Sequence, residues 1–212
     1  QLPGAFKEAN LVASLLDQYG YEMPNNCFNK SSTQIIKALF KDEYKIIHLA
    51  GHGLFDKKNP QASGMLIGNG IFLSTREIGQ TSKVPEMVFV NCCFLGKSDA
   101  VSEKLYNNRY KLAANIGTQL IQNGVKVVIA AGWAVDDAAA LYFTEIFYKE
   151  LLGGSNFGYA IKEARAKTFK HYPNNNTWGA YQCYGDPFFK LRDIKKPVPN
   201  RPYLLAQEAE ND

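Results

Sequence analysis

Cysteine and histidine are scarce in this sequence, and their scarcity restricts the chemistry that the chain can carry out. The 212 residues include four cysteines and three histidines. The cysteines form neither a CxxC pair nor a regular framework, which argues against a zinc knuckle and against the disulfide scaffold of a small secreted protein. We therefore expect a reducing compartment and predict a cytoplasmic protein.

Long apolar runs and blocks of like charge are also missing. No segment approaches the ~20 apolar residues of a membrane helix, and the first residues lack a signal-peptide pattern. The net charge is +4 with the basic residues dispersed, so no stripe of charge is present that would follow a nucleic-acid backbone. We predict neither a membrane span nor direct nucleic-acid binding. A chain that begins with Gln1 fits a fragment of a longer polypeptide.

The hydrophobic pattern predicts a single α/β domain. Three apolar segments are short and rich in β-branched residues, which is typical of buried strands. They are residues 44–50, 86–93 and 125–132. Apolar residues recur at helical spacing in segments 4–19, 31–39, 112–124, 136–153 and 157–169. This alternation predicts a mainly parallel sheet with helices on both faces.

Two shorter signals lie between the first and second strands. Residues 63–74 hold two apolar runs around Asn69-Gly70, which predicts a β-hairpin. Ser74 and Glu77 then form a capping-box pattern, which predicts a short helix.

The edges of the domain follow from composition. We place the domain at residues 1–194 and expect residues 195–212, rich in proline and charge, to form a mobile tail. Residues 97–111 are polar without a period, and we expect an exposed loop there.

Two of the predicted strands end in residues that are suited to catalysis. His52 follows the strand 44–50 and has a glycine on either side, while Cys93 ends the strand 86–93. The glycines would free the backbone so that the imidazole faces solvent, as a general base requires. Because functional residues of parallel sheets gather at the carboxyl ends of strands, we expect His52 and Cys93 at one edge.

Each histidine also has a simpler interpretation. His48 and His52 are four residues apart, but no glutamate completes an HExxH pattern, so we do not expect a metal site. His48 falls within the predicted strand, and we expect it in the core with its ring nitrogens hydrogen-bonded. As an ordinary polar loop residue, His52 would need no catalytic role.

The adjacent cysteines point in opposite directions if they lie in a strand. We expect Cys93 to face the active edge as a nucleophile, activated by a nearby imidazole, and Cys92 to fill the core. On spacing alone, two ordinary buried cysteines remain the simpler interpretation.

Several blocks of the chain, in the same order, resemble the CHAT domain, a caspase-like peptidase module often joined to tetratricopeptide repeats. The blocks are "LPGAFKEA", "IIHLAGHGLFD", "SGMLIGNGIFLSTREI", "PEMVFVNCCFLG", "VIAAGWAVDDAAA" and "WGAYQCYGDPFFKL". The resemblance implies a caspase-like α/β fold and a Cys-His dyad of the kind shared by separases, gingipains and metacaspases. It implies that no cofactor or metal is required.

Carried onto this sequence, the resemblance makes His52 the base and Cys93 the nucleophile. The backbone N–H groups of Gly53 and Cys93 would form the oxyanion hole. Cys93 would attack the scissile carbonyl, His52 would protonate the leaving amine, and water would release the acyl-enzyme.

The sequence departs from the family pattern in two places. Family members usually carry a first strand upstream of the "LPGA" helix, and that strand is absent here or cut off. Asn91 lies two residues before the nucleophile, where relatives that prefer basic residues carry an aspartate in the specificity pocket. A charge for this pocket would then come from Asp136 or Asp137, whose simpler role is helix capping. Trp133 either forms an apolar wall of the pocket or packs under the sheet.

The sequence thus predicts a cysteine endopeptidase that acts on protein or peptide substrates, restrained by a regulatory repeat or sensor domain in the same polypeptide or complex. The alternative is a non-catalytic, caspase-like scaffold module. A small-molecule α/β hydrolase would need a G-x-S-x-G elbow, which the sequence lacks.

Overall fold

The computed structural model of this chain describes residues 3–23, 28–54, 64–68, 71–81, 83–94 and 113–191. For residues 54, 68, 72 and 92–94 it describes the backbone alone. The predictions for Asn69-Gly70, for the loop 97–111 and for the tail 195–212 lie outside the described residues and stay predictions.

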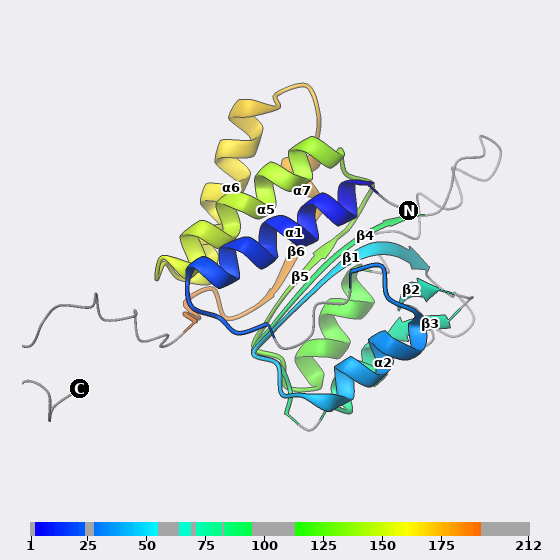
Figure 1. The fold of residues 1–212 in the computed structure, drawn as a ribbon. Helices are drawn as coiled ribbons and strands as arrows, with labels where there is room; N and C mark the ends of the chain where they lie inside the picture. The colour runs from blue at the N-terminus through cyan, green and yellow to red at the C-terminus, as the bar shows by residue number, and fades with distance from the viewer. Residues whose placement is uncertain are drawn as a thin grey trace, which may run out of the picture.

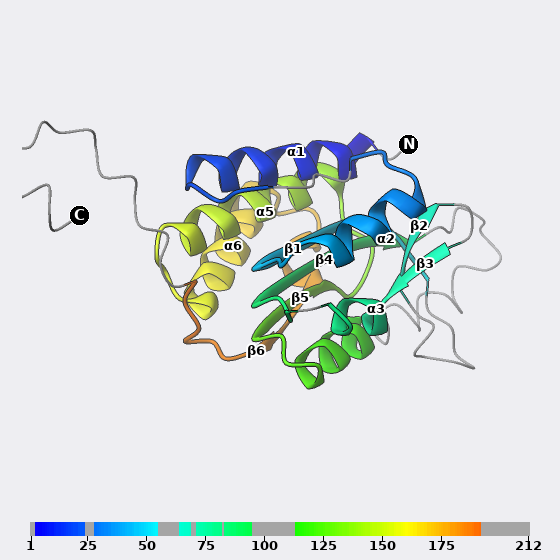
Figure 2. The same cartoon turned by 60° about the horizontal axis from the view of Figure 1, so that its bottom comes forward.

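Among the described residues, a six-stranded sheet forms the centre, in the order β3-β2-β1-β4-β5-β6 (Figure 1). The central strands run parallel to one another; they are β1 (Ile46–Leu54), β4 (Met87–Phe94) and β5 (Val127–Ala131). The outer strands are antiparallel to their neighbours; they are β2 (Gly64–Gly68), β3 (Ile71–Ser74) and β6 (Tyr181–Gly185). Figure 2 shows the β2–β3 hairpin at one end of the sheet.

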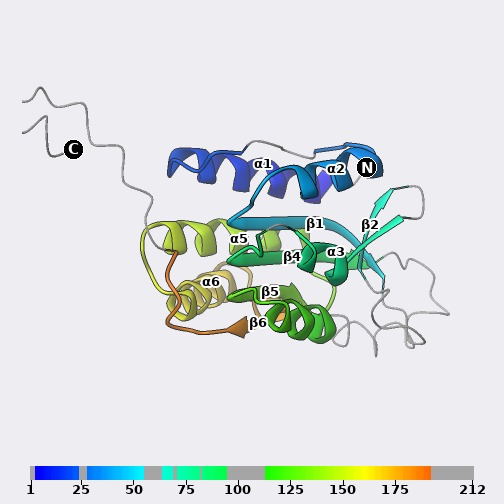
Figure 3. The ribbon, with the colours of Figure 1, turned by 90° about the horizontal axis from the view of Figure 1, so that it is seen from below.

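Helices cover both faces of this sheet, as predicted (Figure 3). One face carries α1 (Pro3–Gln18), α5 (Asp137–Leu152) and α6 (Phe157–His171). The other carries α2 (Ser32–Lys41), α3 (Thr75–Gly79) and a helix that includes residues 113–122. The short helix α7 (Thr177–Ala180) packs against α5 and α6.

Alternate residues of the central strands enter two separate cores. Met87 and Phe89 of β4 face α1 and α5, whereas Val88 and Val90 face α2 and the helix 113–122. All four are almost completely buried, and each large apolar side chain buried in this way contributes about 1.5–3 kcal/mol. Burial on both faces explains why these strands are continuous apolar runs in the sequence.

The last strand was not predicted. β6 (Tyr181–Gly185) pairs antiparallel with β5 at the edge of the sheet, and only Tyr181 is fully buried along it. An edge strand of this kind needs no continuous apolar run, so its residues read as a polar segment. The antiparallel pairing is set by β5, whose paired residues lie fifty or more positions earlier in the chain, so no local pattern contains it.

The capping box at Ser74 is confirmed. The Ser74 side chain accepts a hydrogen bond from the backbone of α3, and the Glu77 carboxylate accepts one from the Ser74 N–H at 2.8 Å. Burial alone would raise the pKa of Glu77, but the hydrogen bonds from Ser74 and the nearby Arg76 outweigh burial and lower it.

Replacing Ser74 with alanine is expected to cost about 1 kcal/mol of unfolding free energy at neutral pH. The lowered pKa means that Glu77 contributes its stabilisation above its unfolded pKa of 4.5 and loses it as the pH falls. The cost should therefore shrink in acid, which urea unfolding at several pH values would measure.

The matched control is Ser31→Ala. Ser31 forms the same capping box at the start of α2, but its partner is the uncharged Gln34. We expect the stability cost of Ser31→Ala to be constant with pH, whereas the cost of Ser74→Ala shrinks in acid. Equal pH dependence at both sites would contradict this account.

Candidate active site

The backbones of His52 and Cys93 are direct neighbours in the sheet. β1 and β4 run parallel, and their register pairs His52 with Cys93 and Gly53 with Phe94. Neighbouring strands lie about 4.8 Å apart, so both positions fall at the carboxyl-terminal edge shared by these two strands. The thiols of Cys92 and Cys93 lie outside the described part of the structure, and the roles predicted for them stay predictions.

The prediction that a free glycine loop follows Ala50 is wrong. β1 continues through Leu54, because its last residues pair with β2 on one side and with β4 on the other. Gly51 permits close packing against β2 and does not make the backbone mobile. A Cβ atom at this position would lie 3.1 Å from the sulfur of Met65. His52 is therefore held in a paired strand, and Gly53 is buried.

The alternation of β1 decides which way His52 faces. Residues two apart in a strand share a face, so His52 lies on the face of His48, which contacts Phe89 and Tyr148 below α1 and α5. His52 is only half-buried. The imidazole thus lies on the α1/α5 side of the sheet edge, where solvent can reach it.

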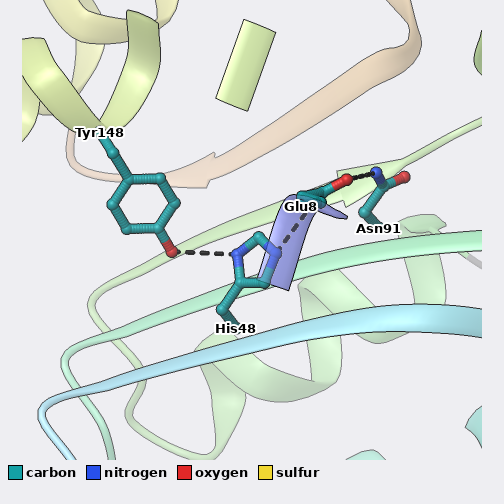
Figure 4. Close-up of polar contacts among 4 residues, drawn as sticks. All are labelled: Glu8, His48, Asn91 and Tyr148. Carbon is teal, nitrogen blue, oxygen red and sulfur yellow. Dashed lines mark hydrogen bonds and ion pairs between the residues drawn. The ribbon is translucent and has the colours of Figure 1, made fainter. Parts of the chain in front are cut away.

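A buried polar network lies beneath this edge (Figure 4). The Nε2 atom of His48 lies 2.9 Å from a carboxylate oxygen of Glu8, and its Nδ1 atom lies 3.1 Å from the Tyr148 hydroxyl. The side chain of His48 is 7% exposed and that of Glu8 is 4% exposed. The prediction that His48 is a core residue with both ring nitrogens hydrogen-bonded is confirmed.

The environment of Tyr148 fixes its role in the network. Complete burial raises the pKa of its hydroxyl well above the usual range, and the charge of Glu8 raises it further. The hydroxyl therefore keeps its proton and can donate to Nδ1 of His48. In the imidazole tautomer with its proton on Nε2, that proton is donated to Glu8 and every polar atom of the ring is satisfied.

Asn91 joins the network from β4. Its Nδ2 group donates to the second carboxylate oxygen of Glu8 at 2.6 Å. Its Oδ1 atom is buried and has no hydrogen-bond partner within the described residues. Such an oxygen is costly to leave unpaired, by roughly 1–3 kcal/mol, so it provides an acceptor for a donor that enters from outside.

A small cavity of about 50 Å³ lies at this point. Glu8, Ala50, Gly51, Asn91 and Asp137 are among the residues that line it. It has room for an ordered water or for the tip of a side chain. The structure thus brings together two of the residues predicted for the substrate pocket, Asn91 and Asp137, next to the strand ends that carry His52 and Cys93.

The other two residues predicted for the pocket lie elsewhere. Asp136 is the N-cap of α5, where its carboxylate accepts a hydrogen bond from the N–H of Ala139 at 2.9 Å. Trp133 is half-buried, and its ring lies beside Gly179 in the short helix α7. Neither residue lines the cavity, and Asp136 has the capping role that its position favoured.

Two residues of the network, Glu8 and Tyr148, did not emerge from the sequence. Glu8 occupies the buried stripe of α1 together with Val12, Leu15 and Leu16, whereas the apolar Phe6 of the same helix is 46% exposed. The sequence signal for a buried Glu8 was its helical spacing, because Glu8 lies four residues before Val12 and seven before Leu15.

Within the ranges that the structure describes, no three His, Cys, Asp or Glu side chains gather as a metal site. No helix in the same ranges has the length and apolar character needed to cross a bilayer.

Comparison with known families agrees with this geometry. The sequence model of the CHAT domain matches residues 1–186. The chain belongs to the CHAT domain family. Members of this family are caspase-like cysteine peptidase modules. No curated protein matches the sequence.

Solved structures place the CHAT domain among caspase-like folds. The crystal structure of the Arg-specific cysteine proteinase gingipain R superposes on it with a TM-score of 0.58. The two sequences are 17% identical, and the match covers 87% of this chain and 42% of the gingipain chain. At this identity the likeness concerns the fold, which is the predicted caspase-like α/β fold. The chain spans less than half of that proteinase.

Proposed function

We propose that this CHAT domain is a cysteine endopeptidase with His52 as the base and Cys93 as the nucleophile. The observation that supports the proposal most directly is the parallel register of β1 and β4, which sets these two residues side by side. An imidazole next to a thiol makes the thiolate accessible at neutral pH. Membership of a caspase-like peptidase family supports the same assignment.

The proposed reaction is acyl transfer to the Cys93 sulfur. The sulfur attacks the scissile carbonyl carbon while His52 takes the thiol proton, and the C–N bond breaks as His52 returns that proton to the leaving amine. Water, deprotonated by His52, then cleaves the thioester and regenerates the thiol. The N–H groups of Gly53 and Cys93 would stabilise the oxyanion, and one such donor is worth about 3 kcal/mol.

We further propose that Asn91 forms the base of the substrate pocket. Its unpartnered Oδ1 atom accepts hydrogen bonds, and the carboxylate of Glu8 lies directly behind it. A substrate side chain with N–H donors would complement this site, because it would pair the orphan oxygen.

The location, substrate and regulation of the enzyme are part of the same proposal. We propose a cytoplasmic enzyme that cleaves a protein substrate and is restrained by a repeat or sensor region of the same polypeptide or complex. The family resemblance supports this setting, since CHAT domains are often joined to tetratricopeptide repeats.

Covalent labelling tests the dyad without a known substrate. We would treat the protein with peptidyl acyloxymethyl ketones that carry Arg, Gln, Leu or Asp next to the reactive group, and locate the adduct by mass spectrometry. Modification of Cys93 is expected, with a rate that falls about 100-fold or more in His52→Ala, since proton transfer by a positioned side chain contributes at least this much.

Cys183 is the internal control for this experiment. Burial raises the pKa of its thiol to about 11, although the nearby Arg165 lowers it somewhat, so little thiolate forms at neutral pH. It should stay unlabelled throughout. Labelling of Cys93 at the same rate with and without His52 would reject the dyad and favour the non-catalytic scaffold.

A further inference from the structure

Exposed aromatic side chains gather along α6 and the segments beside it. Among the described residues, eight large hydrophobic side chains are exposed, and four of them lie in α6, in α7 or just after β6. They are Tyr159, Phe169, Trp178 and Phe188. The rings of Phe169 and Trp178 meet edge to face, with their centroids 5.4 Å apart. A single exposed apolar residue is ordinary, but a group of this kind indicates a binding surface.

A groove of about 410 Å³ runs along this part of α6. The residues of α6 that line it recur at helical spacing from Gly158 to Phe169, and Trp178 of α7 lines it as well. Ile161 and Ala166 make its surface apolar between the two ends. Figure 3 shows α5 between α1 and α6, which makes α6 the outermost of these three helices. Among the described elements, only α6 and α7 line the groove, so a further segment can cover it.

Two cationic side chains line the groove without a carboxylate beside them. Lys162 is exposed, and the guanidinium of Arg165 donates to the Tyr181 carbonyl at 2.7 Å. Within the described residues neither cation forms an ion pair, and no Asp or Glu lines the groove. Elsewhere on α6, by contrast, Lys167 is paired with Glu163. The groove therefore complements an occupant that is both apolar and acidic.

The chain itself contains a segment of this composition. Residues 202–212 have the sequence "PYLLAQEAEND" and lie outside the part of the chain that the structure describes. Tyr203, Leu204 and Leu205 form a short apolar run, three acidic residues follow it, and no basic residue is present. The segment thus has apolar anchors for the aromatic wall of the groove and acids for its two cations.

The path of the chain brings this segment within reach of the groove. The first two N–H groups of α6 donate to the carbonyls of Phe189 and Pro187, at 2.8 Å each. The described part of the chain ends at Leu191, two residues after this contact. From the start of α6 the groove extends for about 17 Å to Phe169, at about 1.5 Å per residue. The residues between Leu191 and Tyr203 span up to about 40 Å when extended, so the segment can reach either end.

We propose that the segment 202–212 docks in the groove formed by α6 and α7. Its apolar residues would pack against Phe169 and Trp178, and its acidic residues would pair with Lys162 and Arg165. The mobility expected for the tail would then apply to the proline-rich part that precedes this segment. The inference rests on the groove and on the sequence of the tail, and it is independent of the proposed peptidase activity.

Competition between the tail and a free copy of it tests the proposal. The probe is a fluorescein-labelled peptide of residues 202–212, whose binding to the full chain is followed by fluorescence anisotropy. Two proteins are compared: the parent, and Leu204→Ser/Leu205→Ser, whose own tail has lost its anchors. A tethered segment has an effective concentration of about 1 mM. With a Kd of about 0.1 mM for the free peptide, the parent should bind the probe about tenfold more weakly than the tail variant does.

Substitutions in the groove locate the probe. In the tail variant, Lys162→Glu and Ala166→Glu should each weaken probe binding about tenfold or more, because each places an acid where the acidic segment would lie. The matched control is Lys7→Glu, which makes the same charge change on α1. It should leave binding within about twofold. All three positions are exposed, and thermal melting confirms that each variant is folded.

Five results would overturn the proposal. The tail is not the occupant if the probe binds both full-length proteins equally, or if it does not bind the tail variant up to about 1 mM. A peptide with residues 202–212 in scrambled order that binds as tightly would indicate general adhesion. An equal loss in Lys7→Glu and Lys162→Glu would place the probe outside the groove. Light scattering that shows a dimer for the parent and a monomer for the tail variant would identify the tail of a second copy as the occupant.

Discussion

Replacing Cys93 with alanine is expected to lower kcat/KM for peptide cleavage by at least about 10⁴-fold, because the attacking atom is lost. The measurement uses a pool of peptides from digested protein, with new ends quantified by mass spectrometry. A peptide identified as a substrate then gives the kinetic constants.

His52→Ala is expected to give a loss of similar size. Members of a catalytic unit act together, so the double variant Cys93→Ala/His52→Ala should be hardly slower than either single variant. This non-additivity is a stronger test than either loss alone, since two independent structural defects would multiply.

Cys92→Ala is the matched control. It removes a thiol from the adjacent position of the same strand, and register pairs it with Gly51 and not with a histidine. Its activity should stay within about tenfold of the parent protein, because a modest packing loss does not remove a reacting group. Cleavage that survives both Cys93→Ala and His52→Ala would reject the assignment, as would equal losses at Cys92 and Cys93.

Much of the fold could be predicted because burial leaves a local record in the sequence. β4 and β5 are covered on both faces, and this makes them continuous apolar runs. The helix starting after Ser74 was recognisable because a capping box involves residues only three apart. The position of His48 in the core followed from its place inside such an apolar run.

Features that depend on pairing between distant segments were harder to predict from the sequence. Gly51, His52 and Gly53 look like a loop, since glycines weaken local strand preference. The β2–β3 hairpin nevertheless holds them in a strand through pairs such as His52 with Leu66. The same limit applies to β6, whose conformation depends on β5.

The polar network around Glu8 could not be predicted from the sequence for a related reason. A glutamate in a helix ordinarily faces solvent, and the partners that make burial of Glu8 tolerable come from β1 and β4, forty or more positions away. The family resemblance could place Asn91 near the site, because it lies two residues before Cys93. It could not show that the Asn91 amide would be held by a carboxylate from the first helix.

Glu8→Ala is expected to lower the free energy of unfolding by about 3–5 kcal/mol, the combined cost of buried donors left without acceptors and of a buried cavity. The change leaves Nε2–H of His48 and Nδ2 of Asn91 as buried donors without acceptors, and it opens a cavity under α1. Urea unfolding measures the difference. Asp17→Ala, at an exposed position of the same helix, should change stability by less than about 0.5 kcal/mol.

Glu8→Gln separates hydrogen bonding from packing. The amide has the same shape as the carboxylate but offers one acceptor and one donor group, so it cannot accept from both His48 and Asn91 as they stand. Rotation of the Asn91 amide by 180° would turn its oxygen toward the new donor. We therefore expect a smaller cost than for alanine, about 1–2 kcal/mol. Equal costs for alanine and glutamine would show that the hydrogen-bonding capacity of the carboxylate, and not its shape, decides the stability.

A double-mutant cycle between Glu8 and His48 completes the test. Glu8→Ala leaves Nε2 of His48 unpaired, so removing the imidazole as well should cost less than the same change in the parent protein. The coupling should be about 1–3 kcal/mol, whereas the pair Asp17→Ala and His48→Ala should be additive. Additivity of Glu8 and His48 would mean that the contact seen at 2.9 Å contributes nothing to stability. With the coupling present, α1 is fixed to the strand that carries His52 by a polar bond as well as by apolar packing, and loosening of α1 would be transmitted to the proposed active site.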